Sequence, residues 1–239
     1  MVKDTPQTAS LVTLMSFSGG YVDTASFMSL HGLFAAHVTG NFVTLGASLV
    51  LGTSGTIAKL LALPVFCCVI MATRLLAYRL ANRGMPVLRL MLLLKLSLLS
   101  IAAFLIIGFG PFSRGDCAFE IFTGMTLVSA MAIQNAAHRI HLSQLPPTTL
   151  MTGTTTQIMI DIADLIHGIA PSETSLISTR LIRMTESIAA FASGCAVAAL
   201  FYSVAKEWCF ILPIPIAIAM LMLKLPAWPP AAPLNSRHA

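Results

Sequence analysis

VLRLMLLLKLSLLSIAAFLIIGF, residues 87–109, is the stretch of this sequence that decides its fold. Apolar residues fill most of it, and Arg89 and Lys95 are its only charged residues. A helix of about 20 apolar residues crosses the roughly 30 Å hydrocarbon core of a bilayer. Residues 87–109 are therefore predicted to form a membrane-spanning helix. Lys95 lies near the start of this helix, and its long side chain is expected to extend to the membrane interface.

The same apolar pattern recurs along the chain. Four further stretches are clearly apolar: 34–52, 57–80, 185–205 and 208–224. Three more polar stretches also match a spanning helix in length: 11–31, 118–138 and 147–167. We therefore predict an all-α, polytopic transmembrane helix bundle of about six to eight spans. It forms a single domain over residues 1–225, and a disordered Pro-rich tail is predicted at 226–239.

The composition of the whole chain favours a membrane protein. Of its 239 residues, 56% are hydrophobic and 10% are charged, and the mean hydropathy is +0.85. Soluble domains carry about 25% charged residues, so this chain lacks the polar groups to cover its surface in water. The formal net charge of +5 comes from basic residues in short links, which argues against nucleic acid as a partner. The lipid bilayer is the expected partner.

The basic links predict an orientation. One link gathers four arginines: Arg74, Arg79, Arg83 and Arg89. Cytoplasmic links are enriched in Lys and Arg, so this link is predicted to be cytoplasmic. Alternation through eight spans then places both chain termini outside. It also places Arg180 and Arg183 outside, which counts against the scheme.

A short motif suggests an internal repeat. Thr39-Gly40 begins one apolar stretch and Thr152-Gly153 begins another, and each follows a polar residue, Asp23 or Asn135, at a similar distance. The chain could then contain two four-helix halves, about 11–109 and 118–224. An even number of crossings per half would make the repeat parallel. A shared Thr-Gly dipeptide is also a frequent chance match.

Two blocks of residues resemble a known family. Gly20-Tyr-Val-Asp23, followed by Phe34 and Val38-Thr39-Gly40-Asn41, is similar to the N-terminal signature of the YoaK-like bacterial membrane proteins. That signature is a Gly-x-x-Asp helix followed by a Thr-Gly-Asn helix, with Met expected where this chain has Val38. The family's second block resembles Gly124, Gln134-Asn135, Arg139, Thr148-Thr149 and Thr152-Gly153. The resemblance covers about residues 15–205 and implies a multi-pass inner-membrane protein of unassigned function.

Asp23 is the first candidate for a functional residue, because it lies within a predicted span. A carboxylate at mid-membrane costs about 2.5–3.5 kcal/mol on insertion scales, so it usually faces a cavity or a partner. Gly19 and Gly20 precede it and are expected to break the helix, which would free backbone groups for a ligand. Alternatively, Asp23 lies near an interface or caps a broken helix through local hydrogen bonds.

The two Thr-Gly segments supply further candidates. These are Thr39, Asn41, Thr152 and Thr154, each beside a glycine that is expected to break the helix, Gly40 or Gly153. Such polar helix starts could line a substrate path. They could equally hydrogen-bond neighbouring helices or cap a helix that enters from the interface.

Other polar residues lie near the ends of predicted spans. Asp161 and Asp164 share one helix face, which suits proton coupling within a span, although a solvated helix end is an equal alternative. Gln134 and Asn135 precede a basic link and could lie in a site or at the membrane surface. His138 is expected in a solvated link.

These patterns favour transport over catalysis. No nucleophile with a base, metal-ligand cluster or cofactor motif is visible in the sequence, so no enzyme activity, metal or cofactor is predicted. The leading hypothesis is a small transporter or permease for an unidentified small solute or ion, in a bacterial inner membrane. The alternative is a non-transporting scaffold or stress-related membrane protein, in which polar residues only join helices. A homo-oligomer is compatible with either.

Overall fold

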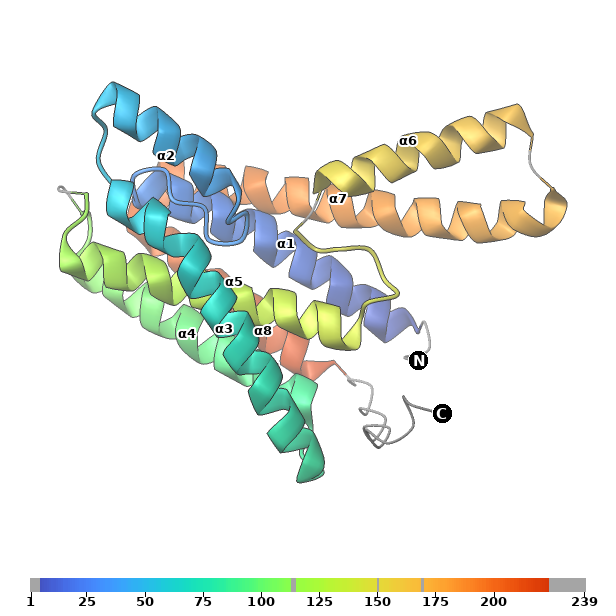
Figure 1. Cartoon of the computed structure of the whole chain (residues 1–239), viewed down its shortest axis with the longest axis horizontal. Helices are drawn as coiled ribbons and strands as arrows, with labels where there is room; N and C mark the ends of the chain where they lie inside the picture. Colours follow the sequence, from blue (N-terminus) through green and yellow to red (C-terminus); the bar gives the residue numbers. More distant parts are fainter. Residues whose placement is uncertain (1–4, 113–114, 150, 169, 224–239) are drawn as a thin grey trace.

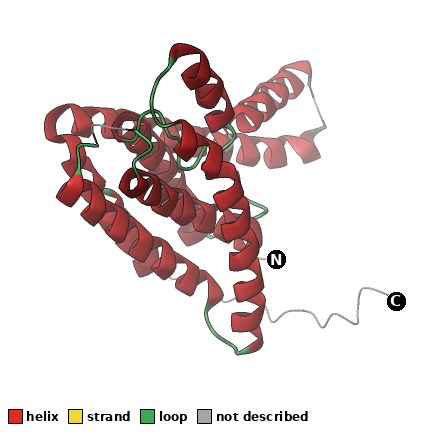
Figure 2. Ribbon diagram, turned by 60° about the vertical axis from the view of Figure 1, so that its left-hand side comes forward, coloured by secondary structure: helices red, strands yellow, loops and turns green. Residues whose placement is uncertain are grey.

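The computed structural model describes residues 5–112, 115–149, 151–168 and 170–223, and within them it consists of helices and loops (Figures 1 and 2). The helices in chain order are α1 (Pro6–Ser29), α2 (Gly40–Leu51), α3 (Thr56–Asn82), α4 (Val87–Phe109), α5 (Ala118–His141), α6 (Met151–His167), α7 (Pro171–Ala205), the 3₁₀ helix η1 (Lys206–Ile211) and α8 (Pro213–Met222). The all-α bundle predicted from the sequence is confirmed. The tail predicted to be disordered, 226–239, lies outside the described residues.

The long helices lie alongside one another in one bundle (Figure 1). α1 begins at the end where α3, α5 and α8 finish, and α6 extends beyond the bundle beside the first part of α7. Among the residues that the structure describes, three helical stretches are long and apolar enough to cross a membrane: Thr56–Asn82, Val87–Phe109 and Glu173–Ile211.

The distribution of exposed and buried groups indicates a membrane protein. Large apolar side chains face outwards, with Val50 85% and Val204 82% exposed. Lys95 and Gln134, in contrast, have no exposed surface. Such an arrangement would be unfavourable in water but suits a hydrocarbon solvent, in which polar groups must find partners inside the protein.

The stretch predicted as a span at 34–52 is not one helix. Residues 30–39 form a loop within the bundle, where Leu33 and Ala35 are fully buried, and the loop turns at His31 and Gly32 with positive φ angles. α2 follows with 12 residues, a length of about 18 Å against the roughly 30 Å of a bilayer core. The prediction of eight full-length spans therefore does not hold, and the outside position of the termini, which was deduced from it, loses its basis.

The predicted helix break at Gly19 and Gly20 is wrong, because α1 is continuous from Pro6 to Ser29. The glycines instead allow α1 to lie directly on α7. A Cβ atom at Gly20 would lie 2.1 Å from the carbonyl oxygen of Phe191, and one at Gly194 would lie 2.1 Å from that of Phe17. Small residues on facing helices permit such close backbone approach.

The two predicted halves make matching contacts. α1 packs on α7 as α5 packs on α3, α2 packs on α3 as α6 packs on α7, and α4 packs on α5 as α8 packs on α1. Corresponding helices, such as α1 and α5 or α4 and α8, run in opposite directions (Figure 1). The halves are therefore inverted and not parallel as expected. The reason is that α2, with 12 residues, does not run the length of the bundle and so does not reverse the direction of the chain within the first half.

Candidate functional site

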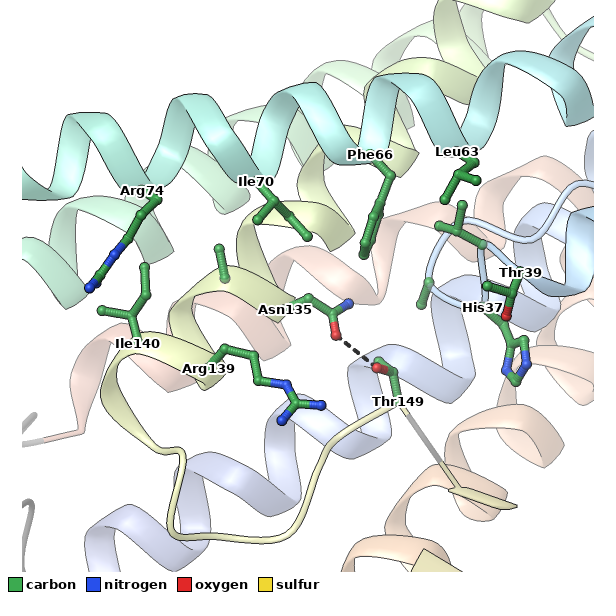
Figure 3. Close-up of a pocket in the computed structure, with 13 residues that line it drawn as sticks. His37, Thr39, Leu63, Phe66, Ile70, Arg74, Asn135, Arg139, Ile140 and Thr149 are labelled. Atoms are coloured by element: carbon green, nitrogen blue, oxygen red, sulfur yellow. Dashed lines mark hydrogen bonds between the residues drawn. The ribbon is translucent and has the colours of Figure 1, made fainter. Parts of the chain in front are cut away.

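A cavity of about 550 Å³ lies between α3, α5 and the loop that precedes α2 (Figure 3). Its polar lining residues are His37, Thr39, Arg74, Asn135, Arg139 and Thr149. Two of these, Thr39 and Asn135, are residues that the sequence predicted for a site. The cavity brings them together from segments almost 100 residues apart in the chain.

The α3 wall of the cavity follows from helical spacing. Leu63, Phe66, Ile70 and Arg74 are three or four residues apart, so their side chains lie along one face of the helix, and that face is turned towards α5 (Figure 3). Three of these positions are apolar. Arg74, nearer the end of α3, donates a hydrogen bond of 2.9 Å to the hydroxyl of Tyr78 and lies 4.3 Å from the centre of its ring.

Asp23 and Asn41 hold the loop that forms another wall. The carboxylate of Asp23 accepts hydrogen bonds from the backbone N–H of Ala36 at 2.6 Å and of His37 at 3.2 Å. Asn41 accepts from the N–H of Phe34 and donates to its carbonyl oxygen, both at 2.8 Å. A loop inside a membrane bundle needs such partners, because no water satisfies its backbone. Both predicted site residues thus shape the cavity without lining it.

The last turns of α5 supply the polar floor. The hydroxyl of Thr149 donates to the Asn135 amide oxygen at 2.8 Å, and the Asn135 amide nitrogen donates to the carbonyl oxygen of Met131 at 3.1 Å. Arg139 follows Asn135 after four residues and therefore lies on the same face of the helix. Its guanidinium extends along the cavity towards Thr149 (Figure 3).

The lining of the cavity carries positive charge. It includes two arginines and one histidine but no Asp or Glu. Within the described residues, no carboxylate forms a salt bridge with Arg74 or Arg139. Arg74 is half-buried and Arg139 is exposed, so neither residue is enclosed by the protein. The site can therefore accept an anionic group.

The comparisons place the chain in a family without giving it an activity. The family model described as "Protein of unknown function (DUF1275)" matches residues 11–223. The chain belongs to the DUF1275 family. The YoaK-like resemblance is consistent with this membership. No curated protein and no solved structure matches the chain.

In this DUF1275 chain, Gln134 belongs to a second polar cluster, away from the cavity. Lys95 of α4 donates to the hydroxyl of Ser18 at 3.0 Å and to the side-chain oxygen of Gln134, whose nitrogen donates to the carbonyl oxygen of Met15 at 2.9 Å. The expected extension of Lys95 to the interface is therefore wrong. Lys95 lies eight residues into α4, about 12 Å from its start, which is farther than a lysine side chain reaches.

The candidates on α6 also lie apart from the cavity. Asp161 is fully buried and accepts a hydrogen bond from Arg180 Nε of α7 at 2.9 Å. Thr154 is buried on the same face of α6, whereas Thr152 is exposed on the outer face. Gly153 lies in the first turn of a continuous helix and does not break it. The two Thr-Gly segments therefore do not converge, because α6 packs on α7 alone among the described helices.

Gly40 marks a helix start and not an interruption, since it is the first residue of α2. A Cβ atom there would lie 3.1 Å from the side chains of Phe34 and His37, so a small residue helps the loop to fold back on the helix.

Sequence reasoning missed several lining residues. Arg74 was assigned to a basic link, Arg139 and Thr149 were noted as part of the family resemblance, and His37 drew no attention. The four-residue spacing of Asn135 and Arg139 was the available signal, because it places both on one helix face. His138 also differs from the expected solvated link residue: it is buried within α5, with its ring 2.9 Å from the carbonyl oxygen of Pro146.

Proposed function

We propose that this protein is a permease of the bacterial inner membrane, with several membrane crossings, that carries a small solute through the cavity between α3 and α5. One observation carries the proposal: a cavity of about 550 Å³ between the helices of the bundle is lined by six polar side chains. Ligand sites in proteins are typically about 300–1,000 Å³. The proposal is of a permease and not of an enzyme.

The proposed orientation places the arginine-rich end in the cytoplasm. The α3–α4 link and the ends of α3 and α5 carry Arg74, Arg79, Arg83 and Arg139, which matches the bias of cytoplasmic segments towards basic residues. α1 begins at this same end (Figure 1), so its start is cytoplasmic. Under this orientation the cavity lies nearer the cytoplasmic side.

The inverted halves support a mechanism of alternating access. Many transporters consist of inverted repeats that rock against each other around a site at the repeat interface. Here α3 belongs to the first half and α5 to the second, so the cavity lies between the halves. A relative movement of α3 and α5 would open or close it. Thr39 belongs to the first half and Asn135 to the second, so such a movement would change the distance between them.

The test is the accessibility of the cavity from the two sides of the membrane. Ile70→Cys is introduced into a chain whose five native cysteines are replaced by alanine, and a membrane-impermeant maleimide is applied to spheroplasts and to inverted membrane vesicles. A permease predicts labelling of Cys at position 70 in both preparations. Leu99→Cys, at a packed position that is 2% exposed, is the matched control and should react in neither. Labelling from one side only would favour the non-transporting scaffold.

A further inference from the structure

The charges of the cavity are arranged for a ligand of opposite sign. Arg74 reaches it from α3 and Arg139 from α5, and both are named among its lining residues (Figure 3). No lining residue is acidic, and neither guanidinium has a carboxylate partner within the described residues. Two helices thus bring positive charge to one cavity, whatever these arginines contribute to orientation.

The chemistry of arginine narrows the ligand. A guanidinium is always charged and presents several N–H donors in a planar fork that matches a carboxylate or phosphate. Charge-assisted hydrogen bonds of this kind are about twice as strong as neutral ones. Asn135 and Thr149 already bond to each other and complete the floor. Arg74 uses one of its N–H donors on the hydroxyl of Tyr78 and keeps the others for a ligand.

The apolar wall of the cavity narrows the class of ligand further. Leu63, Phe66 and Ile70 cover the α3 side of the cavity, and Ile140 lies on the α5 side. A bare inorganic anion would leave these side chains in contact with water. A ligand with an apolar body would cover them and gain about 25 cal/mol for each Å² of apolar surface removed from water.

We propose that the cavity binds a small organic anion, with its carboxylate drawn by the positive charge of Arg74 and Arg139 and its apolar body against Leu63, Phe66 and Ile70. This inference rests on the proposed function, because it names the class of solute that the same site would carry. The anionic group and the apolar body are shared by a soluble carboxylate and an anionic lipid. The structure favours the soluble form, because His37, Thr39 and Asn135 line the cavity where a lipid chain would need apolar contacts.

The test compares benzoate with benzamide, which share an apolar ring and differ in charge. Purified full-length protein in a neutral detergent is titrated with each at constant ionic strength, and the thermal midpoint is followed, since a ligand of the native state raises it. Benzoate is expected to raise the midpoint in a saturable manner, and benzamide, which has the ring without the charge, to raise it much less. Equal shifts with both, or no shift with benzoate, would overturn the proposal.

Variants of the arginines test whether benzoate acts at this cavity. Arg74→Gln and Arg139→Gln should each weaken benzoate binding about tenfold or more, because each removes a charged hydrogen-bond donor. Arg79→Gln is the matched control, since Arg79 is an exposed arginine of α3 outside the cavity lining, and it should bind benzoate as the natural protein does. Undiminished binding in both cavity variants would refute the assignment. So would stabilisation by phosphatidylglycerol with no response to benzoate.

The failure of this inference and that of the permease are distinguishable. Benzoate binding that depends on Arg139, together with maleimide labelling from one side only, would leave an anion site in a protein that does not transport. Labelling from both sides without benzoate binding would leave a permease with another class of solute.

Discussion

Replacing Gly20 with alanine should separate α1 from α7, because the new Cβ atom would lie 2.1 Å from the carbonyl oxygen of Phe191. Ordinary contacts of a Cβ atom begin at 3.4 Å, so the two backbones must move apart by roughly 1 Å. Excess volume in a packed interior costs about 1–3 kcal/mol, and the rigid backbone on the α7 side argues for the upper part of that range. Gly194→Ala meets the oxygen of Phe17 at the same distance and should behave alike.

The assay is thermal unfolding of each variant in detergent. For a chain of this size, 1 kcal/mol corresponds to a shift of about 2–4 °C, so a loss of about 4–12 °C is expected for each single variant. The double variant should lose less than the sum, because one separation of the helices accommodates both methyl groups.

Gly108→Ala is the matched control for this prediction. Gly108 lies within α4, and a Cβ atom there would have nothing within 4 Å. Alanine at such a position is neutral or stabilises the helix by up to about 1 kcal/mol. If Gly20→Ala unfolded at the same temperature as Gly108→Ala, the close crossing of α1 and α7 would be refuted.

Three further predictions concern buried polar groups. Lys95→Met should lower the free energy of unfolding by about 1–3 kcal/mol, because the Gln134 oxygen loses its donor, and adding Gln134→Leu should restore most of the loss. Asp161→Ala should cost about 1–2 kcal/mol and speed amide hydrogen exchange in α6, because the helix loses its ion pair with Arg180. Asp23→Ala should cost about 2–4 kcal/mol and expose the loop before α2 to protease, because two buried N–H groups lose their acceptor.

Each of these has a control within the chain. Gln134→Leu alone should have a lower free energy of unfolding than the double variant with Lys95→Met. Equal free energies of unfolding would show that Lys95 and Gln134 are not coupled. Asp164→Asn, on the same helix as Asp161, should change exchange in α6 far less, since both guanidinium hydrogen bonds of Arg180 go to Asp161. Asp23→Asn keeps one acceptor oxygen and should lose less than Asp23→Ala; an equal loss would contradict the backbone role of the carboxylate.

Hydropathy predicted the elements whose surroundings are uniform. The stretch 87–109 coincides with α4, and 57–80 is close to Thr56–Asn82, because lipid contact selects a continuous apolar run. The segment 34–52 was mispredicted, since Ala35, Ala36 and Val38 are as apolar in a buried loop as in a span. Hydropathy does not distinguish these environments. The loop depends on Asp23, whose contact with it spans 13 residues.

The candidate site was predictable only in part, for the same reason. Polar residues within spans pointed to Thr39 and Asn135, which line the cavity. The partner of each side chain is set by helix packing, which a single sequence does not encode in a readable form. Asp161 thus pairs with Arg180, and Gln134 with Lys95, each from another helix. Arg74 and Arg139 resembled ordinary basic residues at helix ends until α3 and α5 brought them to one space.

The Lys95 cluster has a consequence for energetics under the proposed mechanism. α4 and α8 correspond in the two inverted halves and contact each other, yet α4 contributes an amine where α8 contributes Met220, whose sulfur lies 3.7 Å from Lys95 Nζ. Identical halves would make the inward-facing and outward-facing states mirror one another with equal free energy. Because Lys95 and Met220 differ, the two states would have different free energies. Such a carrier rests facing one side of the membrane even when no solute gradient exists.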